Sequence, residues 1–230
     1  MSELNLMRQY TAMKQALKNS TAMDALHKTR LHRSLSWLKA AAQQLEDDNQ
    51  DLAFINLWIS FSACFYIDGE SMAPFSEKNP FIDKLVALDS DNKIYECFWH
   101  EYSGSVKALI KNPYVFAEFW QAQRLLTGNQ QLDADIHQGW QSQFDRSSVA
   151  ALNCLSRKKV APLFSIVLDR LYVLRNQVLQ GGATYQSRVN REQVSDGVIL
   201  LANIMPIIIS IMLQGQDEHW GDIAYPVVND

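Results

Sequence analysis

The chain has 230 residues, of which 47% are hydrophobic and 20% are charged, and its formal net charge at pH 7 is -4. This composition supplies a hydrophobic core and excludes an intrinsically disordered chain. The negative net charge excludes a general electrostatic attraction to nucleic acid, so any contact with RNA or DNA has to be local.

The three cysteines and five histidines form no metal-binding pattern. Cys64, Cys97 and Cys154 are scattered without a C-x-x-C pair, as buried thiols in a reducing compartment are. No H-E-x-x-H pair is present. The N-terminus lacks the basic and apolar segments of a secretory signal. We therefore expect a cytoplasmic protein without a metal or another cofactor.

Helical periodicity begins near the N-terminus, and no clear period-two strand or Asn-Gly hairpin interrupts it. It predicts a short amphipathic helix over about 3–18 and a second helix, capped by Asp24, that runs to about Leu45. A third helix is expected over about 51–67, with an aromatic stripe typical of a buried core. The stretch 68–79 has the composition of a loop.

The middle of the chain, about 80–145, is expected to hold several short helices. Pro113 is placed at a helix start, because proline is tolerated in the first helical turn. Gly128 and Gly139 are candidate breaks. Ser147 or the next serine is expected to cap a further short helix.

The last third of the chain shows clearer boundaries. A long helix is predicted over about 160–179, and Gly181 with Gly182 is expected to end it. Asn190 is expected to cap the last helix, which runs to about Leu213 and bends near Pro206.

The apolar segment 198–213 is too short and too often interrupted to span a bilayer, so we expect a buried core helix there. The tail 215–230 is expected to be loosely ordered. Together these patterns predict an all-α fold in a single domain, 1–230. Its core helices are expected at about 24–67 and 148–214, with a helical insertion at about 70–145.

The stretch 175–182 reads Arg-Asn-Gln-Val-Leu-Gln-Gly-Gly and ends the long apolar helix. Arg175 and Asn176 are neighbours, and Gln180 lies at the last turn, where its side chain can reach toward them. A guanidinium binds a phosphate in two-pronged fashion, and an amide can hold a hydroxyl or a base. These three residues are therefore the candidate site for a small anionic group.

A structural role for the same residues stays open. Arg175 can instead pair with a carboxylate of a neighbouring helix, with Asp169, Glu192 and Asp196 as candidates. Asn176 and Gln180 would then satisfy carbonyl groups at the helix end.

The segment 174–182 resembles the R-x4-6-H motif of the HEPN superfamily, whose larger members often read Arg-Asn-x-x-x-His-Gly-Gly at the end of a core helix. The segment 51–61 resembles the F-I-x-L-W-I-A-F helix that those proteins carry upstream. The helix start at 190–193 and the apolar last helix also match. The resemblance covers about 30–66 and 160–213 and leaves the middle uncovered.

The resemblance implies an all-helical homodimer in which two copies of the motif line one cleft. Many HEPN proteins are metal-independent ribonucleases of toxin–antitoxin or antiphage systems, with RNA as substrate and an antitoxin or defence protein as partner. By this resemblance, Arg175 would stabilise the phosphorane charge and Asn176 would position RNA. Position 180 would supply the general acid or base.

The chain departs from the motif at that position, because Gln180 stands where the motif has histidine. An amide cannot exchange a proton near neutral pH, so the cleft is expected to bind RNA and to cleave it poorly. Gln180 is either natural or an engineered replacement of histidine. The alternative function is a noncatalytic dimeric module that binds RNA or a partner. His219, beyond the last helix, is not expected to replace the missing group.

Two further features have competing interpretations. The cluster Arg157-Lys158-Lys159 can contact a phosphate backbone, but a favourable charge cluster at a helix C-terminus is the preferred interpretation. Tyr185 and Arg188 follow the two glycines and could reach the cleft, where the tyrosine could stack on a base; the default is an ordinary loop.

Overall fold

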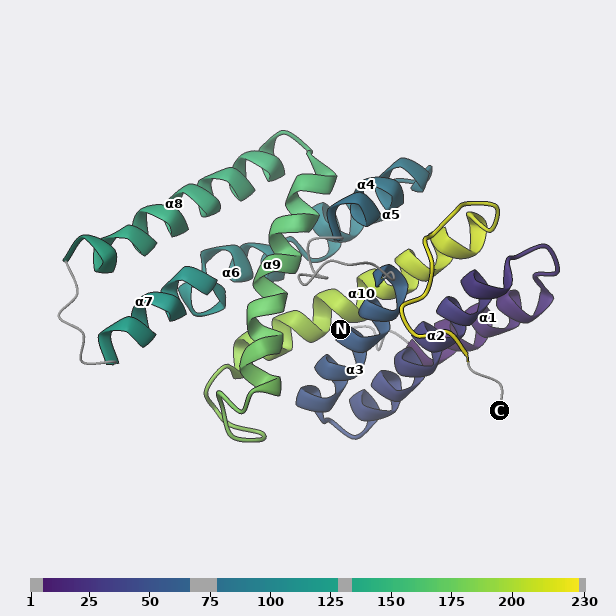
Figure 1. Ribbon diagram of the computed structural model, residues 1–230, viewed down its shortest axis with the longest axis horizontal. Coiled ribbons are helices and arrows are strands. Elements are labelled where there is room, and N and C mark those ends of the chain that lie inside the picture. Colours follow the sequence, from purple (N-terminus) through teal and green to yellow (C-terminus); the bar gives the residue numbers. More distant parts are fainter. Residues whose placement is uncertain (1–5, 67–77, 128–133, 228–230) are drawn as a thin grey trace.

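The computed structural model describes residues 6–66, 78–127 and 134–227, apart from the side chains of 126–127 and 134–138. All regular secondary structure in these residues is helical, so the predicted all-α fold is confirmed (Figure 1). The predicted loop falls mostly on 67–77, and the candidate break at Gly128 falls on 128–133; both ranges lie outside the described residues.

Five helices form the main bundle: α1 (Leu6–Asn19), α2 (Ala25–Glu46), α3 (Gln50–Phe65), α9 (Val160–Leu179) and α10 (Arg191–Gln214). Between α3 and α9 the chain forms α4 (Lys78–Leu88), α5 (Lys93–Glu96), the π-helical turn η2 (Cys97–Glu101), α6 (Ser103–Lys111), the 3-10 turn η3 (Pro113–Val115), α7 (Ala117–Thr127) and α8 (Ala134–Ser156). Figure 1 shows α6, α7 and α8 on one side of α9, with α1, α2 and α3 on the other.

The predicted starts of α2 and α3 follow from local capping. The side chain of Asp24 accepts hydrogen bonds from the backbone N–H groups of Leu26 and His27 at 2.8 and 3.1 Å, as predicted. Asn49 caps α3 by accepting from the N–H of Leu52, so α3 begins one residue earlier than expected. The aromatic stripe of α3 is buried in the core as predicted, with Phe54 fully buried.

Helix α10 is the core helix of the bundle. Among the described residues it is the one helix long and apolar enough to cross a membrane, and 61% of its most apolar window is buried inside the protein. Asn203, one of two polar residues in this apolar run, donates to the carbonyl of Ile199 and accepts from the hydroxyl of Tyr102 at 2.7 Å. The segment is therefore a buried helix with its polar group satisfied, as predicted. Pro206 lies inside α10.

The predicted boundaries around α8 are wrong. One helix runs through Gly139 and through both serines that were expected to cap a later helix. Ser147 accepts a hydrogen bond from Arg170 of α9 at 3.0 Å, and Ser148 donates to the carbonyl of Ile110 at the end of α6. The two hydroxyl groups therefore link α8 to its neighbours, a role that local sequence cannot distinguish from capping.

The expectation of a loosely ordered tail is also wrong as far as Ile223. Trp220 and Ile223 are buried, and the indole of Trp220 stacks on His27 with ring centres 5.6 Å apart. Arg30 of α2 donates to the carbonyls of Gly221 and Asp222. The tail therefore lies against α2 and closes that side of the core.

His27 has a structural environment. Its Nε2 lies 3.0 Å from the carbonyl of Met212, and its Nδ1 is buried without a hydrogen-bond partner. Burial lowers the pKa of His27, because protonation would add a buried N–H with nothing to accept it. The ring is therefore neutral and donates through Nε2.

Gly197 marks the closest approach of α10 to its neighbours. A Cβ atom there would lie 2.8 Å from Cε2 of Phe54 and 3.2 Å from a methyl carbon of Leu171 and of Leu174. Phe54 is fully buried and has no space to move aside. The contact therefore needs a residue without a side chain.

We expect Gly197→Ala to lower the free energy of unfolding by about 1–2 kcal/mol, because overpacking outweighs the helix propensity that alanine gains. Gly139→Ala is the matched control, since nothing lies within 4 Å of a Cβ there and the residue is helical. It should stabilise the protein by up to about 1 kcal/mol. Urea unfolding measures both; equal stability of the two variants would contradict this packing.

Candidate functional site

The C-terminus of α9 ends in a Schellman motif. The N–H of Gly182 donates to the carbonyl of Gln177 at 2.7 Å, and the N–H of Gly181 donates to that of Val178. Gly181 has φ +70°, a conformation that favours glycine. The predicted stop is therefore confirmed, and it leaves Gln180 as the exposed C-cap residue of α9.

The three candidate residues lie together at this end, on two adjacent faces of the last turns. Asn176 and Gln180 are four residues apart and share one face. Arg175 lies beside them, half-buried, and its Nη1 donates to Oδ1 of Asn176 at 2.8 Å. No hydrogen bond joins Arg175 to Gln180, so the structure connects the arginine to the site through Asn176.

Arg175 has no carboxylate partner among the described residues. Asp169 pairs instead with Lys78 at 3.0 Å, and Asp196 is hydrogen-bonded to Ser105. The Nε of Arg175 is buried without a hydrogen-bond partner. Its guanidinium carbon lies 6.0 Å from the ring centre of Tyr172, the outer limit of a cation–π contact. The three proposed ion pairs are therefore wrong, and the arginine keeps donors for another anion.

A groove of about 370 Å³ opens between α7, the end of α9 and the segment that leads into α10. Its lining is rich in side-chain amides and includes two of the candidate residues: Ala117, Trp120, Arg124, Val173, Asn176, Gln177, Gln180, Gly182, Val189 and Asn190. Arg175 is not part of this lining and is joined to it by its hydrogen bond to Asn176.

A hydrogen-bond network holds the groove together. The carbonyl of Tyr114, in η3, accepts from the amide of Gln177 and from the indole N–H of Trp120, the latter at 2.7 Å. Gln177 in turn accepts from Nδ2 of Asn190 at 2.8 Å. Asn190 occupies the position before α10 in a left-handed conformation and makes no side-chain cap, so the predicted capping bond is wrong. Instead, the side-chain amide of Asn190 lines the groove and donates to Gln177.

Four lining residues with polar or aromatic side chains were not among the predicted site residues: Trp120, Arg124, Gln177 and Asn190. Trp120 and Arg124 belong to the middle segment, more than 50 residues before the motif. They reach the site because α7 packs against α8 and η3, which in turn contact α9, and no short-range sequence pattern predicts such contacts.

The part of the loop around Tyr185 and Gln186 is attached to α3 and does not line the groove. The N–H of Gln186 donates to Asp51 at 2.8 Å, and Arg191 forms an ion pair with the same carboxylate at 3.1 Å. Tyr185 is 62% exposed and accepts a hydrogen bond from Asn49. Neither Tyr185 nor Arg188 lines the groove, so the ordinary loop interpretation holds.

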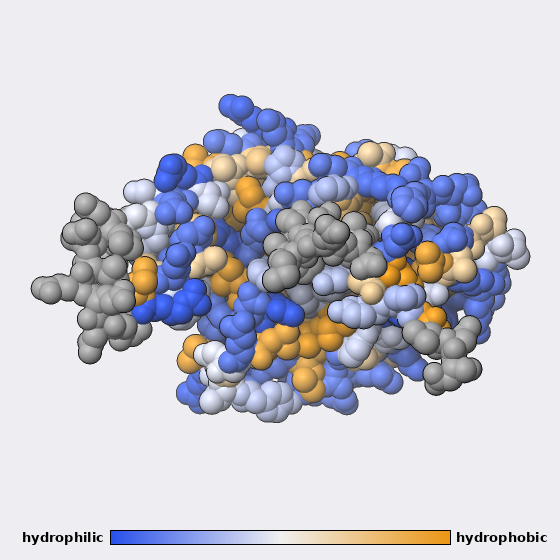
Figure 2. Space-filling view, viewed as in Figure 1, coloured by the Kyte–Doolittle hydropathy of each residue, from blue (hydrophilic) through white to orange (hydrophobic). Residues whose placement is uncertain are grey.

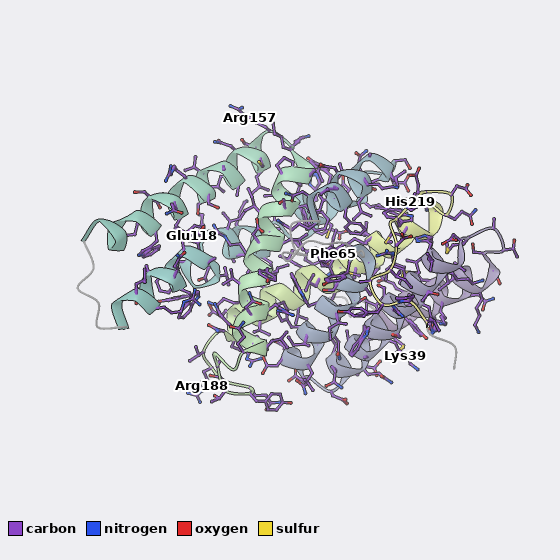
Figure 3. The ribbon with its side chains drawn as sticks, in the orientation of Figure 1. Lys39, Phe65, Glu118, Arg157, Arg188 and His219 are labelled. Atoms are coloured by element: carbon purple, nitrogen blue, oxygen red, sulfur yellow. The ribbon has the colours of Figure 1, made fainter. Side chains whose placement is uncertain are left out.

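The basic cluster at 157–159 lies at the C-terminal end of α8, where positive charge is favourable. The ammonium of Lys158 lies over the ring of Tyr95 at 5.3 Å. Figure 3 shows Arg157 and Arg188 at opposite ends of α9, so this cluster is remote from the groove.

None of the four histidines with described side chains lines the groove. His27 is buried against Trp220, and Figure 3 shows His219 on the other side of the molecule from Arg188. Nor does the described part of the chain hold a group of three or more His, Cys, Asp or Glu residues that could bind a metal ion.

Comparisons with protein-family models, curated proteins and solved structures find no match to this chain.

Proposed function

We propose that the chain is a HEPN-type, cytoplasmic RNA-binding protein that acts as a homodimer and has a glutamine in place of the catalytic histidine. It binds single-stranded RNA at the end of α9 and cleaves it poorly. This scaffold fits a ribonuclease of a toxin–antitoxin or antiphage system, with an antitoxin or defence protein as a further partner.

The observation that carries the proposal is Arg175, a half-buried arginine without a carboxylate partner among the described residues. A buried or half-buried cation is normally paired. Here the guanidinium donates one hydrogen bond to Asn176 and keeps further donors. The C-terminus of a helix repels anions by itself, so phosphate binding at this end of α9 depends on the arginine.

Gln180 supports binding without efficient cleavage. It is exposed beside Asn176 at the groove, at the position where the general acid or base for cleavage would lie. An amide donates and accepts hydrogen bonds but does not transfer a proton. No described histidine is near enough to replace it.

An exposed apolar face beside the motif supports the dimer. Leu52 of α3 is 45% exposed and Leu179 of α9 is 49% exposed. Tyr185 is 62% exposed and accepts a hydrogen bond from Asn49, the cap residue of α3. Figure 2 shows hydrophobic side chains exposed over α3. Burial of this face against a second copy would bring two motifs together. The same face favours the alternative function, a noncatalytic module that binds a partner protein.

Arg175→Ala is expected to weaken binding of a fluorescently labelled, single-stranded RNA octamer by about 10- to 100-fold, the loss of a charge-assisted phosphate contact. The slope of log affinity against log salt should fall by about 0.7, the value for one phosphate of a single strand. Fluorescence anisotropy at several salt concentrations measures both.

Arg157→Ala is the matched control, because it removes the same charge from an exposed position at the other end of α9. It should leave the affinity within about twofold. Equal losses in the two variants would mean that only net charge matters and would contradict a site at Arg175.

A further inference from the structure

The groove between α7 and α9 has a defined hydrogen-bonding pattern, set by four side-chain amides: Asn176, Gln177, Gln180 and Asn190. Gln177 uses both ends of its amide inside the protein, since Nε2 donates to the carbonyl of Tyr114 and Oε1 accepts from Nδ2 of Asn190. One of the two N–H donors of Asn190 is therefore used. Its Oδ1 is left for a ligand, and it can only accept.

Asn176 is oriented the opposite way. A guanidinium has donors only, so its bond to Arg175 fixes Oδ1 toward the arginine and leaves Nδ2 as a donor. Gln180 is exposed and makes no side-chain hydrogen bond to a described residue, so its amide can present either end. The groove therefore offers a fixed donor, a fixed acceptor and one adaptable amide.

Trp120 places an aromatic ring at the groove, and two contacts fix the orientation of that ring. Its indole N–H is anchored on the carbonyl of Tyr114 at 2.7 Å, and its ring meets Phe119 edge-to-face with centres 5.1 Å apart. The ring is partly exposed at the groove. A fixed, partly exposed ring is the stacking platform on which single-stranded nucleic acid places a base.

We propose that this groove holds one unstacked nucleobase, flat against Trp120, with a base edge hydrogen-bonded to Asn176 and Asn190. The inference rests on the RNA-binding function proposed above and names what that site recognises. Each standard base has an edge on which a donor and an acceptor are neighbours, and Gln180 can meet a third polar group where the edge carries one. The volume of about 370 Å³ lies at the lower end of the range for small-ligand sites, ~300–1,000 Å³.

The test compares two probes with the full-length protein: a labelled single-stranded RNA octamer and an octamer of the same backbone without bases. The base-bearing probe is expected to bind roughly 5- to 150-fold more tightly, the effect of one stacked base. In Trp120→Ala this ratio should fall to near one. Asn176→Asp keeps an acceptor toward Arg175 but removes the free donor, so it should lower the ratio as well.

Trp37→Ala is the control, because Trp37 is 39% exposed on α2 and does not line the groove. It should leave the ratio unchanged. If circular dichroism shows that Trp120→Ala does not fold, the ratio measured for Asn176→Asp tests the base site on its own.

The outcomes separate the two proposals. Equal binding of both probes by the unmodified protein, or an unchanged ratio in the folded groove variants, would overturn the base site and leave RNA binding intact. Binding of neither probe would overturn both.

Discussion

Gln180→His is expected to give this chain an RNA-cleaving activity, without added metal, about 10²–10⁴-fold above that of the unmodified protein. The exposed C-cap position places a side chain beside Asn176, which is itself bonded to Arg175. An imidazole there could take and return a proton near neutral pH, which the amide cannot. Cleavage of a labelled single-stranded RNA in the presence of a chelator, followed by gel analysis, measures the rate.

Two variants control this experiment. Gln180→Asn keeps an amide and should cleave no faster than the unmodified protein. Gln180→His combined with Arg175→Ala should lose the new activity, because the phosphorane charge would lack its cation. A folded, dimeric Gln180→His protein that cleaves no RNA would contradict the ribonuclease scaffold and favour the noncatalytic binding module.

Arg30→Met is expected to lower the free energy of unfolding by about 3–5 kcal/mol, the largest stability loss that we predict. Arg30 is 1% exposed, and its guanidinium donates to four carbonyls: those of Cys64, Tyr66, Gly221 and Asp222. Methionine keeps the apolar stem but leaves these carbonyls without their donor. For a chain of this size the melting temperature should fall by roughly 6–20 °C.

Lys39→Met on the same helix is the control, since Lys39 is exposed (Figure 3) and its loss should change stability by less than about 0.5 kcal/mol. Removing the residues after Gly215 deletes two of the four acceptors, so the truncation and Arg30→Met should be less than additive. The expected fall in melting temperature is roughly 6–20 °C. If Arg30→Met melted within about 2 °C of the unmodified protein, Arg30 would not hold the tail in place.

The elements that were predicted well are those whose signals are local. Asp24 caps α2 through its own carboxylate, and the Gly181-Gly182 pair ends α9 through backbone hydrogen bonds within six residues. The aromatic stripe of α3 and the apolar run of α10 are buried, as their helical periodicity predicts, because each helix has an apolar face that packs against the core.

The predictions failed where the role of a residue depends on a partner that is distant in sequence. Ser147 was predicted to cap a helix, but its hydroxyl accepts a hydrogen bond from Arg170. Asn190 was also predicted to cap a helix, but its amide donates a hydrogen bond to Gln177. The tail as far as Ile223 is ordered because Arg30, nearly 200 residues earlier, donates hydrogen bonds to the carbonyls of Gly221 and Asp222. None of these contacts has a signature in short-range spacing.

The candidate site was predicted in part. Sequence identified Arg175, Asn176 and Gln180, and the structure places all three at one end of α9. It did not identify the other wall of the groove, because Trp120 and Arg124 reach the site only through the packing of the middle helices. The middle segment, which the HEPN resemblance leaves uncovered, therefore supplies one side of the groove.

The measurement that tests the central claim most directly is photo-crosslinking of the unmodified protein to a short RNA that carries 4-thiouridine, with the crosslinked peptides mapped by mass spectrometry. The account predicts crosslinks in the segment 173–190 at the end of α9 and at Trp120 of α7. Crosslinks confined to α1 and α2, or no crosslinks at all, would contradict an RNA site at this end of α9.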